Sequence, residues 1–112
     1  MKHVLFTLYD CNPELLDDRM FIEQLLFDTA KASGATFLNT ISHKFEPQGV
    51  TAVTLLAESH ISIHTWPEEG KAVCDIFTCG QADPMLGFAM MRSKLQAMSS
   101  VHHQCDRPFA IN

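Results

Sequence analysis

Basic residues are scarce in this sequence, which has 8 Lys and Arg against 13 Asp and Glu and a formal net charge of −5. A nucleic-acid-binding surface needs clustered Lys and Arg to neutralise phosphates, so we expect no nucleic-acid partner. The sequence also has no apolar run of 18 residues, and its first ten residues lack a secretory core and a small-residue cleavage site. We therefore expect a cytoplasmic protein with no membrane partner.

Cysteine is sparse as well, with 4 residues and no Cys-x-x-Cys pair. This usage does not suit a disulfide scaffold, so we expect reduced thiols at Cys11, Cys74, Cys79 and Cys105. The remaining composition is that of a globular protein, with 46% hydrophobic and 19% charged residues. At 112 residues the chain is predicted to be a single domain, 1–112, whose modest core would benefit from pairing with a second copy.

The hydrophobic pattern predicts strands and helices in one α+β domain. Residues 2–9 are expected to form a strand, and a long amphipathic helix is expected between a cap at Asn12 and a stop at Gly34. A second helix follows the similar cap at Asp83. Further strands are predicted at 35–45, 50–57, 60–66, 71–78 and 100–105.

This order, β-α-β-β-β-β-α-β, is typical of a two-layer sandwich in which helices cover one face of a largely antiparallel sheet. The other face of the sheet is left bare. A bare face on a small sheet is a candidate for burial against a second subunit, so we expect it at a dimer interface.

Side chains capable of chemistry concentrate between residues 57 and 80. Within 59–66 the sequence alternates as a half-buried strand does. Ile61 and Ile63 point to one face, and the other face carries His60, Ser62, His64 and Trp66. A buried strand face usually takes valine or isoleucine, so this row of polar and aromatic residues requires an explanation.

Metal binding is one interpretation, because imidazole and thiolate are zinc ligands. A first possible set consists of His60, His64, Cys74 and Cys79. Two histidines four residues apart on a strand lie about 13 Å apart, however, which is too far to share one ion. A second possible set consists of His102, His103 and Cys105, but a surface strand that contains histidine is the commoner explanation. We therefore predict no metal site.

Two residues keep more than one interpretation from spacing alone. Cys79 could be a nucleophile activated by His64 or His60, as in a thiol hydrolase, or a small buried hydrophobic residue. Ser59 could be an ordinary turn hydroxyl or the site of a chain cleavage.

The segment from Glu58 to Glu68, ESHISIHTWPE, followed by DIFTCG at 75–80, closely resembles a known family. It is similar to the processing and active-site segment of the small prokaryotic S-adenosylmethionine decarboxylase proenzymes. The resemblance extends more weakly through residues 33–36 and 45–50. The predicted order of elements also agrees with that family's sandwich fold.

The resemblance implies that the protein cuts its own Glu58–Ser59 bond. In the family, the serine hydroxyl attacks the preceding carbonyl, and elimination and hydrolysis then leave a covalent pyruvoyl group. This would divide the chain into a β chain, 1–58, and an α chain, 59–112, whose cofactor is a pyruvoyl group derived from Ser59. The ketone of that group condenses with the substrate's amine and accepts the electrons released as carbon dioxide leaves.

The resemblance also implies roles in catalysis and processing. Cys79 matches the family's proton donor, and a thiol with the usual pKa of about 8.5 is largely protonated at neutral pH. His64 matches the residue that assists elimination during processing, for which an imidazole is suited. Thr51 stands where the family often has serine, and its hydroxyl is expected to support processing.

For the substrate, Phe45 and Trp66 resemble positions near the family's adenine site, where aromatic faces stack on a base and attract a sulfonium. Glu68 resembles a ligand of the ribose hydroxyls. Two residues depart from the family pattern. Thr7 stands where a glutamate is common, and Lys71 stands where an aromatic residue is common.

The implied enzyme is a carboxy-lyase that converts S-adenosylmethionine into the aminopropyl donor for spermidine and polyamine synthesis. The family's active site is built between two subunits, so the implied partners are the substrate and a second αβ protomer in a homodimer. Two alternatives keep the same scaffold. One is a pyruvoyl-dependent decarboxylase of arginine or ornithine, and the other is a relative that is not cleaved and only binds a partner.

Overall fold

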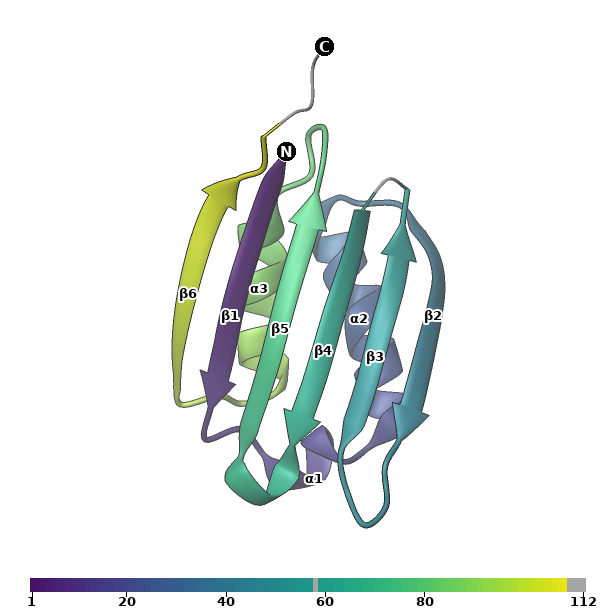
Figure 1. Ribbon diagram of the computed structural model, residues 1–112, viewed down its shortest axis with the longest axis vertical. Helices are drawn as coiled ribbons and strands as arrows, with labels where there is room; N and C mark the ends of the chain where they lie inside the picture. Colours follow the sequence, from purple (N-terminus) through teal and green to yellow (C-terminus); the bar gives the residue numbers. More distant parts are fainter. Residues whose placement is uncertain (58, 109–112) are drawn as a thin grey trace.

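Six antiparallel strands form one sheet in the computed structural model, which describes residues 1–57 and 59–108 (Figure 1). Hydrogen-bonded neighbours follow the order β2-β3-β4-β5-β1-β6, so the first strand of the chain lies between the last two. In that order the strands are β2 (Phe37–Lys44), β3 (Val50–Leu56), β4 (Ser59–Trp66), β5 (Lys71–Thr78), β1 (Lys2–Tyr9) and β6 (Ser99–Asp106). The predicted strands and the antiparallel sheet are confirmed.

Two helices, α2 (Arg19–Ser33) and α3 (Pro84–Lys94), lie side by side against one face of this sheet (Figure 1). They bury alternate residues of each strand, for example Val4, Phe6 and Leu8 of β1. Full burial of a side chain of this size contributes roughly 1.5–3 kcal/mol to folding. The opposite face of the sheet carries no helix in the described part of the chain, as the sequence predicts.

The predicted long helix from Asn12 to Gly34 is wrong in one respect, because the structure breaks it into two. Asn12 caps only the short α1 (Pro13–Leu16), which ends at Asp17. Asp18 has an extended backbone, and its carboxylate accepts a hydrogen bond from the Phe21 amide at 3.0 Å to start α2. The neighbouring Asp17 carboxylate accepts a hydrogen bond from the amide of Gly49, the residue just before β3. Two adjacent aspartates therefore end one helix and begin the next, and a second short helix, η1 (Pro67–Glu69), joins β4 to β5.

A glycine allows the two long helices to approach closely. A Cβ atom on Gly87 of α3 would overlap Ser33 Oγ of α2 and come within 2.9 Å of Thr29 and Ile76 side-chain atoms. Ser33 Oγ is buried and has no hydrogen-bond partner within the described part of the chain. The contact between α2 and α3 therefore depends on two small residues, Gly87 and Ser33, and it leaves the Ser33 hydroxyl without a hydrogen bond.

This packing predicts the stability of three variants. Gly87→Ala should lower the free energy of unfolding by up to about 2 kcal/mol, because an overpacking cost of about 1–3 kcal/mol is reduced by a gain in helix propensity of about 1 kcal/mol. Ser33→Ala should leave the free energy of unfolding unchanged or raise it by up to about 1 kcal/mol, since it removes the unsatisfied hydroxyl. The double variant should recover part of the loss, as measured by urea unfolding in a double-mutant cycle. Strictly additive effects would contradict the proposed contact.

Candidate active site

The hydroxyl of Ser59 lies 3.7 Å from the sulfur of Cys79. Ser59 begins β4 just after the β3–β4 connection, and Cys79 follows the last residue of β5. Because β4 and β5 are antiparallel neighbours, the start of one strand meets the end of the other at the same end of the sheet. The structure thus brings together two predicted site residues that are 20 positions apart in the sequence.

The residues on either side of position 58 are held by hydrogen bonds. Ser59 also donates a hydrogen bond from its hydroxyl to the carbonyl oxygen of Ala57 at 3.4 Å, and the Ala57 amide is bonded to the Thr36 carbonyl at 3.0 Å. The predicted cleavage residue Glu58 lies outside the described residues. The serine that follows it is half-buried, with its hydroxyl close to a backbone carbonyl and to a thiol.

Two other cysteines have a different environment. Cys11 and Cys74 are buried in the core, where desolvation raises the pKa of Cys11 to about 11 and that of Cys74 well above its usual value. Such thiols are poor acids and poor nucleophiles at neutral pH. Cys79 is half-buried beside Ser59, which makes it the better candidate for chemistry.

The remaining predicted residues gather near the opposite end of the sheet. Thr51 and His64 are directly paired on β3 and β4, and the Thr51 hydroxyl lies 3.1 Å from His64 Nδ1. They line a groove of about 410 Å³ together with Phe45, Trp66 and Glu68. This volume lies within the range of about 300–1,000 Å³ that is typical of ligand pockets.

The loop that carries Phe45 is anchored to the break between the first two helices. The Gly49 amide donates to Asp17 Oδ1 at 2.8 Å, and Lys44 Nζ lies 2.9 Å from the same oxygen. The hydrogen bond from Gly49, followed by that from Lys44, holds the pKa of Asp17 below its usual value. Phe45 itself is bonded to Gly49 through its amide at 2.8 Å, so its ring is held at the rim of the groove.

The position of Lys71 gives its departure from the family pattern a physical meaning. Its ammonium lies 5.4 Å from the centre of the Trp66 ring and 3.0 Å from Glu69 Oε1. This cation–π contact covers one part of the indole and places a positive charge at the edge of the groove.

Within one chain, the Ser59–Cys79 pair and the groove lined by Thr51, His64 and Trp66 do not form one cavity. Ser59 and Trp66 are the first and last residues of β4, so they lie about 23 Å apart at roughly 3.3 Å per residue. His64 is about 16 Å from Ser59 by the same measure. The pairing of Cys79 with His64 that a thiol hydrolase would need is therefore not formed within one chain.

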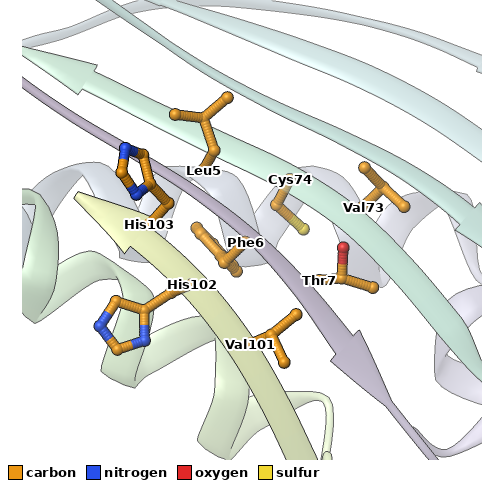
Figure 2. Close-up of a pocket in the computed structure, with 8 residues that line it drawn as sticks. All are labelled: Leu5, Phe6, Thr7, Val73, Cys74, Val101, His102 and His103. Carbon is orange, nitrogen blue, oxygen red and sulfur yellow. The ribbon is translucent and has the colours of Figure 1, made fainter. Parts of the chain in front are cut away.

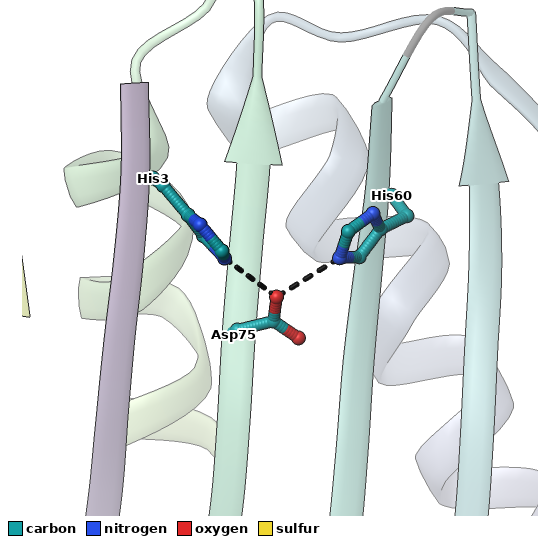
Figure 3. Close-up of side chains that lie close together, drawn as sticks. All are labelled: His3, His60 and Asp75. Atoms are coloured by element: carbon teal, nitrogen blue, oxygen red, sulfur yellow. Dashed lines mark hydrogen bonds and ion pairs between the residues drawn. The ribbon is translucent and has the colours of Figure 1, made fainter. Parts of the chain in front are cut away.

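The open face also carries a cluster that the sequence analysis did not predict (Figure 3). Asp75 Oδ2 accepts hydrogen bonds from His3 Nε2 at 2.7 Å and from His60 Nε2 at 2.9 Å, and Ser62 donates to Oδ1. His3 and His60 are both register partners of Phe77, and each side chain reaches diagonally back to Asp75. The alternation of β4 pointed to this face, but only strand register reveals which residues meet.

The charge on Asp75 is stabilised by these partners. Burial by itself would raise the pKa of this carboxyl, but hydrogen bonds from Ser62, His3 and His60 outweigh it and hold the pKa below its usual value. Asp75 is therefore a carboxylate at neutral pH. Within residues 1–57 and 59–108, His3, His60 and Asp75 are the group whose ligand atoms lie close enough to hold a metal ion.

The two metal sets considered from the sequence are not assembled. Cys74 points into the core while His60 and His64 lie on the open face, so strand alternation separates them. His102 packs on Phe88 of α3 with ring centres 5.0 Å apart, whereas the adjacent His103 lies on the other face.

A second hollow of about 310 Å³ lies over β5, β1 and β6 on the open face (Figure 2). It contains Thr7, one of the two residues that the sequence resemblance marks as departures. Its other lining residues are mainly apolar and include Leu5, Phe6, Val73, Cys74, Val101, His102 and His103. The small side chain at position 7 thus leaves an uncharged depression in the sheet face.

No helix in the described ranges is both long and apolar enough to cross a membrane.

The family model described as S-adenosylmethionine decarboxylase matches residues 2–108. An S-adenosylmethionine decarboxylase proenzyme of Parasynechococcus marenigrum is 55% identical over 97 residues, which are 86% of this chain and 76% of that protein. One from Methanococcus maripaludis is 55% identical over 80 residues, which are 71% of this chain and 66% of that protein.

The fold comparison agrees with the sequence comparisons. The crystal structure of the adenosylmethionine decarboxylase from Aquifex aeolicus superimposes with a TM-score of 0.85 and 34% sequence identity, covering 98% of this chain and 92% of that chain. The chain therefore belongs to the S-adenosylmethionine decarboxylase family.

Proposed function

We propose that this chain is a proenzyme that cleaves itself between Glu58 and Ser59 and then decarboxylates S-adenosylmethionine. The product would serve as an aminopropyl donor in polyamine synthesis. The observation that carries the proposal is the 3.7 Å contact between Ser59 Oγ and Cys79 Sγ in a member of this decarboxylase family. Buried cysteine thiols such as Cys11 and Cys74 fit a reducing compartment, so we include cytoplasmic localisation in the proposal.

Self-cleavage needs a nucleophile next to a carbonyl, and Ser59 supplies the hydroxyl. Its oxygen bonds to the Glu58 carbonyl carbon, the C–N bond to Ser59 breaks, and the hydroxyl proton passes to the freed amine. Loss of the Ser59 Cα proton then breaks the Cβ–O bond and releases a carboxylate at Glu58. Water replaces the nitrogen as ammonia, which leaves a pyruvoyl group at residue 59 and requires no oxidant.

The surroundings of Ser59 fit such a group. The residue is half-buried at the start of a strand, where a new chain end does not disrupt the sheet, and a thiol lies beside it. The pyruvoyl group supplies an electrophilic carbonyl that binds the substrate's amine and accepts the electrons released with carbon dioxide.

Cys79 is proposed as the proton donor to the substrate after carbon dioxide leaves. Its sulfur is already within hydrogen-bonding range of residue 59, so little movement separates it from the reacting carbon. The half-buried site also limits competing proton exchange with water.

The groove at the other end of the sheet is proposed to bind the adenosyl part of the substrate. Phe45 and Trp66 are 45% and 38% exposed, so both rings are accessible for stacking on a base. Glu68 can accept hydrogen bonds from two ribose hydroxyls. Two aromatic rings and a carboxylate would also suit a guanidinium, so the preference for S-adenosylmethionine over arginine or ornithine rests on the family model and on the relatives named as S-adenosylmethionine decarboxylases.

A homodimer is proposed because the two groups lie about 23 Å apart within one chain. A twofold axis that stacks two open faces with their strands reversed would bring Ser59 of one chain toward Trp66 of the other. His64 and Thr51 would then assist cleavage in the partner chain. The open face supports this arrangement because it exposes large apolar side chains that suit an interface, namely Leu5, Ile41, Val53, Leu55, Val73 and Val101.

Replacement of the nucleophile tests self-cleavage. Ser59→Ala should remain one full-length chain without decarboxylase activity, whereas the wild-type protein should give two fragments on a denaturing gel. The mass of fragment 59–112 should be that of a pyruvoyl rather than a serine start. Ser93→Ala, at an exposed position of α3, is the control and should be cleaved normally. Wild-type turnover in Ser59→Ala would refute the assignment.

Replacement of the thiol separates cleavage from turnover. Cys79→Ala should still be cleaved but should lose about 100- to 10,000-fold in turnover, which is the usual contribution of a general acid. Cys105→Ala, a half-buried cysteine on β6, should retain wild-type turnover. Carbon dioxide release from labelled substrate measures both rates, and full activity in Cys79→Ala would exclude its role as proton donor.

Coexpression of two inactive chains tests the composite site. Ser59→Ala and Trp66→Ala chains should form mixed dimers in which one of the two sites is intact, which gives about a quarter of wild-type activity after random pairing. Coexpression of the wild-type chain with the double variant Ser59→Ala/Trp66→Ala is the control. It should also give about a quarter of wild-type activity, all of it from wild-type homodimers, because neither site of that mixed dimer is complete. If each site lay within one chain, the first mixture would stay inactive and the second would reach about half of wild-type activity.

A further inference from the structure

The carboxylate of Asp75 joins three strands on the open face. His3 from β1 and His60 from β4 donate to one of its oxygens, and Ser62 from β4 donates to the other (Figure 3). The rings of His3 and His60 also pack against Phe77, with centres 5.4 Å and 5.7 Å from it. These contacts satisfy a half-buried carboxylate that is not among the residues proposed for cleavage or decarboxylation.

A metal ion is a weaker explanation of this cluster than a hydrogen-bond network. Arg107 Nη1 lies 3.2 Å from His3 Nδ1, and an arginine can only donate, so this nitrogen is the acceptor. The proton of a neutral His3 is then on Nε2, which faces Asp75. A metal bound at Nε2 would need the opposite tautomer, with Nδ1–H donated to an acceptor.

The two histidines differ in what they anchor. His60 directly follows Ser59, so its bond to Asp75 fixes the chain one residue after the proposed cleavage site. On the other side, the Ala57 amide is held by the Thr36 carbonyl at 3.0 Å. His3 instead anchors β1, far from this connection in the chain. The bonds of Ala57 and His60 therefore bracket the segment that must bend for the Ser59 hydroxyl to attack.

We propose that Asp75, acting through His60, is a positioning residue for self-cleavage at Ser59. The inference rests on the proposed self-cleavage and adds a residue pair that sets its rate. Attack on a preceding carbonyl requires close alignment of hydroxyl and carbonyl, and a misplacement of about 1 Å can slow such a step about 100-fold. Asp75 contributes no atom to the reaction, and its effect passes through the ring that it holds.

The charged and titratable groups near this pair come from β1 and from β6 and the residues after it, while β3 places Leu55 opposite His60. They are His3 on β1, Cys105 on β6 and Arg107 after β6, with His60 and Asp75 themselves on β4 and β5. His3 and His60 make bonds of nearly equal length to the same oxygen, and the side chain of His3 is the less exposed, at 12% against 37%. A purely structural role therefore predicts that loss of His3 is at least as harmful as loss of His60.

The test compares the two histidines. His60→Ala and His3→Ala precursors are made by cell-free synthesis, and the loss of the full-length band on a denaturing gel gives the rate of cleavage. The free energy of unfolding of each histidine variant is measured with urea in the uncleavable Ser59→Ala background, so that intact chains are compared. His60→Gln, whose amide can still donate to Asp75, tests rescue.

His60→Ala should slow cleavage by about 10- to 100-fold, and His3→Ala by less than about threefold, with His60→Gln recovering most of the rate. Asp75→Ala, which removes the acceptor of the His60 bond, should slow cleavage as His60→Ala does. Equal slowing by both histidine variants, or slowing in proportion to lost stability, would overturn the inference while self-cleavage stands. A wild-type precursor that never cleaves would instead refute the proposed function on which it rests.

Discussion

The arrangement of this protein follows from the way its helices cover the sheet, which in residues 1–57 and 59–108 they do on one face only. Each strand must send alternate side chains to α2 and α3, so the other half of its residues collects on the open face. In β4 this places Ile61 and Ile63 in the core and leaves His60, His64 and Trp66 outside. One-sided burial therefore places the groove residues of the proposed function on the open face. Ser59 alternates in step with Ile61 instead, and it meets Cys79 at the end of the sheet.

The direction of the strands determines how these groups are distributed. The antiparallel pairing of β4 and β5 brings Ser59 to Cys79 at one end of the sheet, and the pairing of β3 and β4 brings Thr51 to His64 nearer the other end. A rigid strand keeps these ends apart, so no side-chain rotation can join them. The proposal of a composite site in a homodimer follows from this geometry, and it gives the apolar open face a reason to be exposed.

Much of the fold could be predicted from the sequence, because period-two alternation and helix caps are local signals. The break at Asp17 and Asp18 could not be predicted, because the cap at Asn12 looks the same whether the helix after it is short or long. At the break, the Asp17 carboxylate accepts the amide of Gly49, which lies 32 residues away and is invisible to a local pattern. The Asp75 cluster was missed for a similar reason: His3 and His60 meet only when β1 and β4 flank β5, which is a matter of register rather than pattern.

The position of β1 has a consequence for a chain that has been cut. Residues 1–57 supply β1, β2 and β3, whereas residues after 58 supply β4, β5 and β6. In the sheet, β1 of the first piece lies between β5 and β6 of the second piece and is hydrogen-bonded to both. A break beside Ser59 removes none of these strand pairings, and the two pieces would separate only if the β3–β4, β5–β1 and β1–β6 pairings all broke. A chain with this strand order can therefore lose one peptide bond between β3 and β4 and still keep its six-stranded sheet.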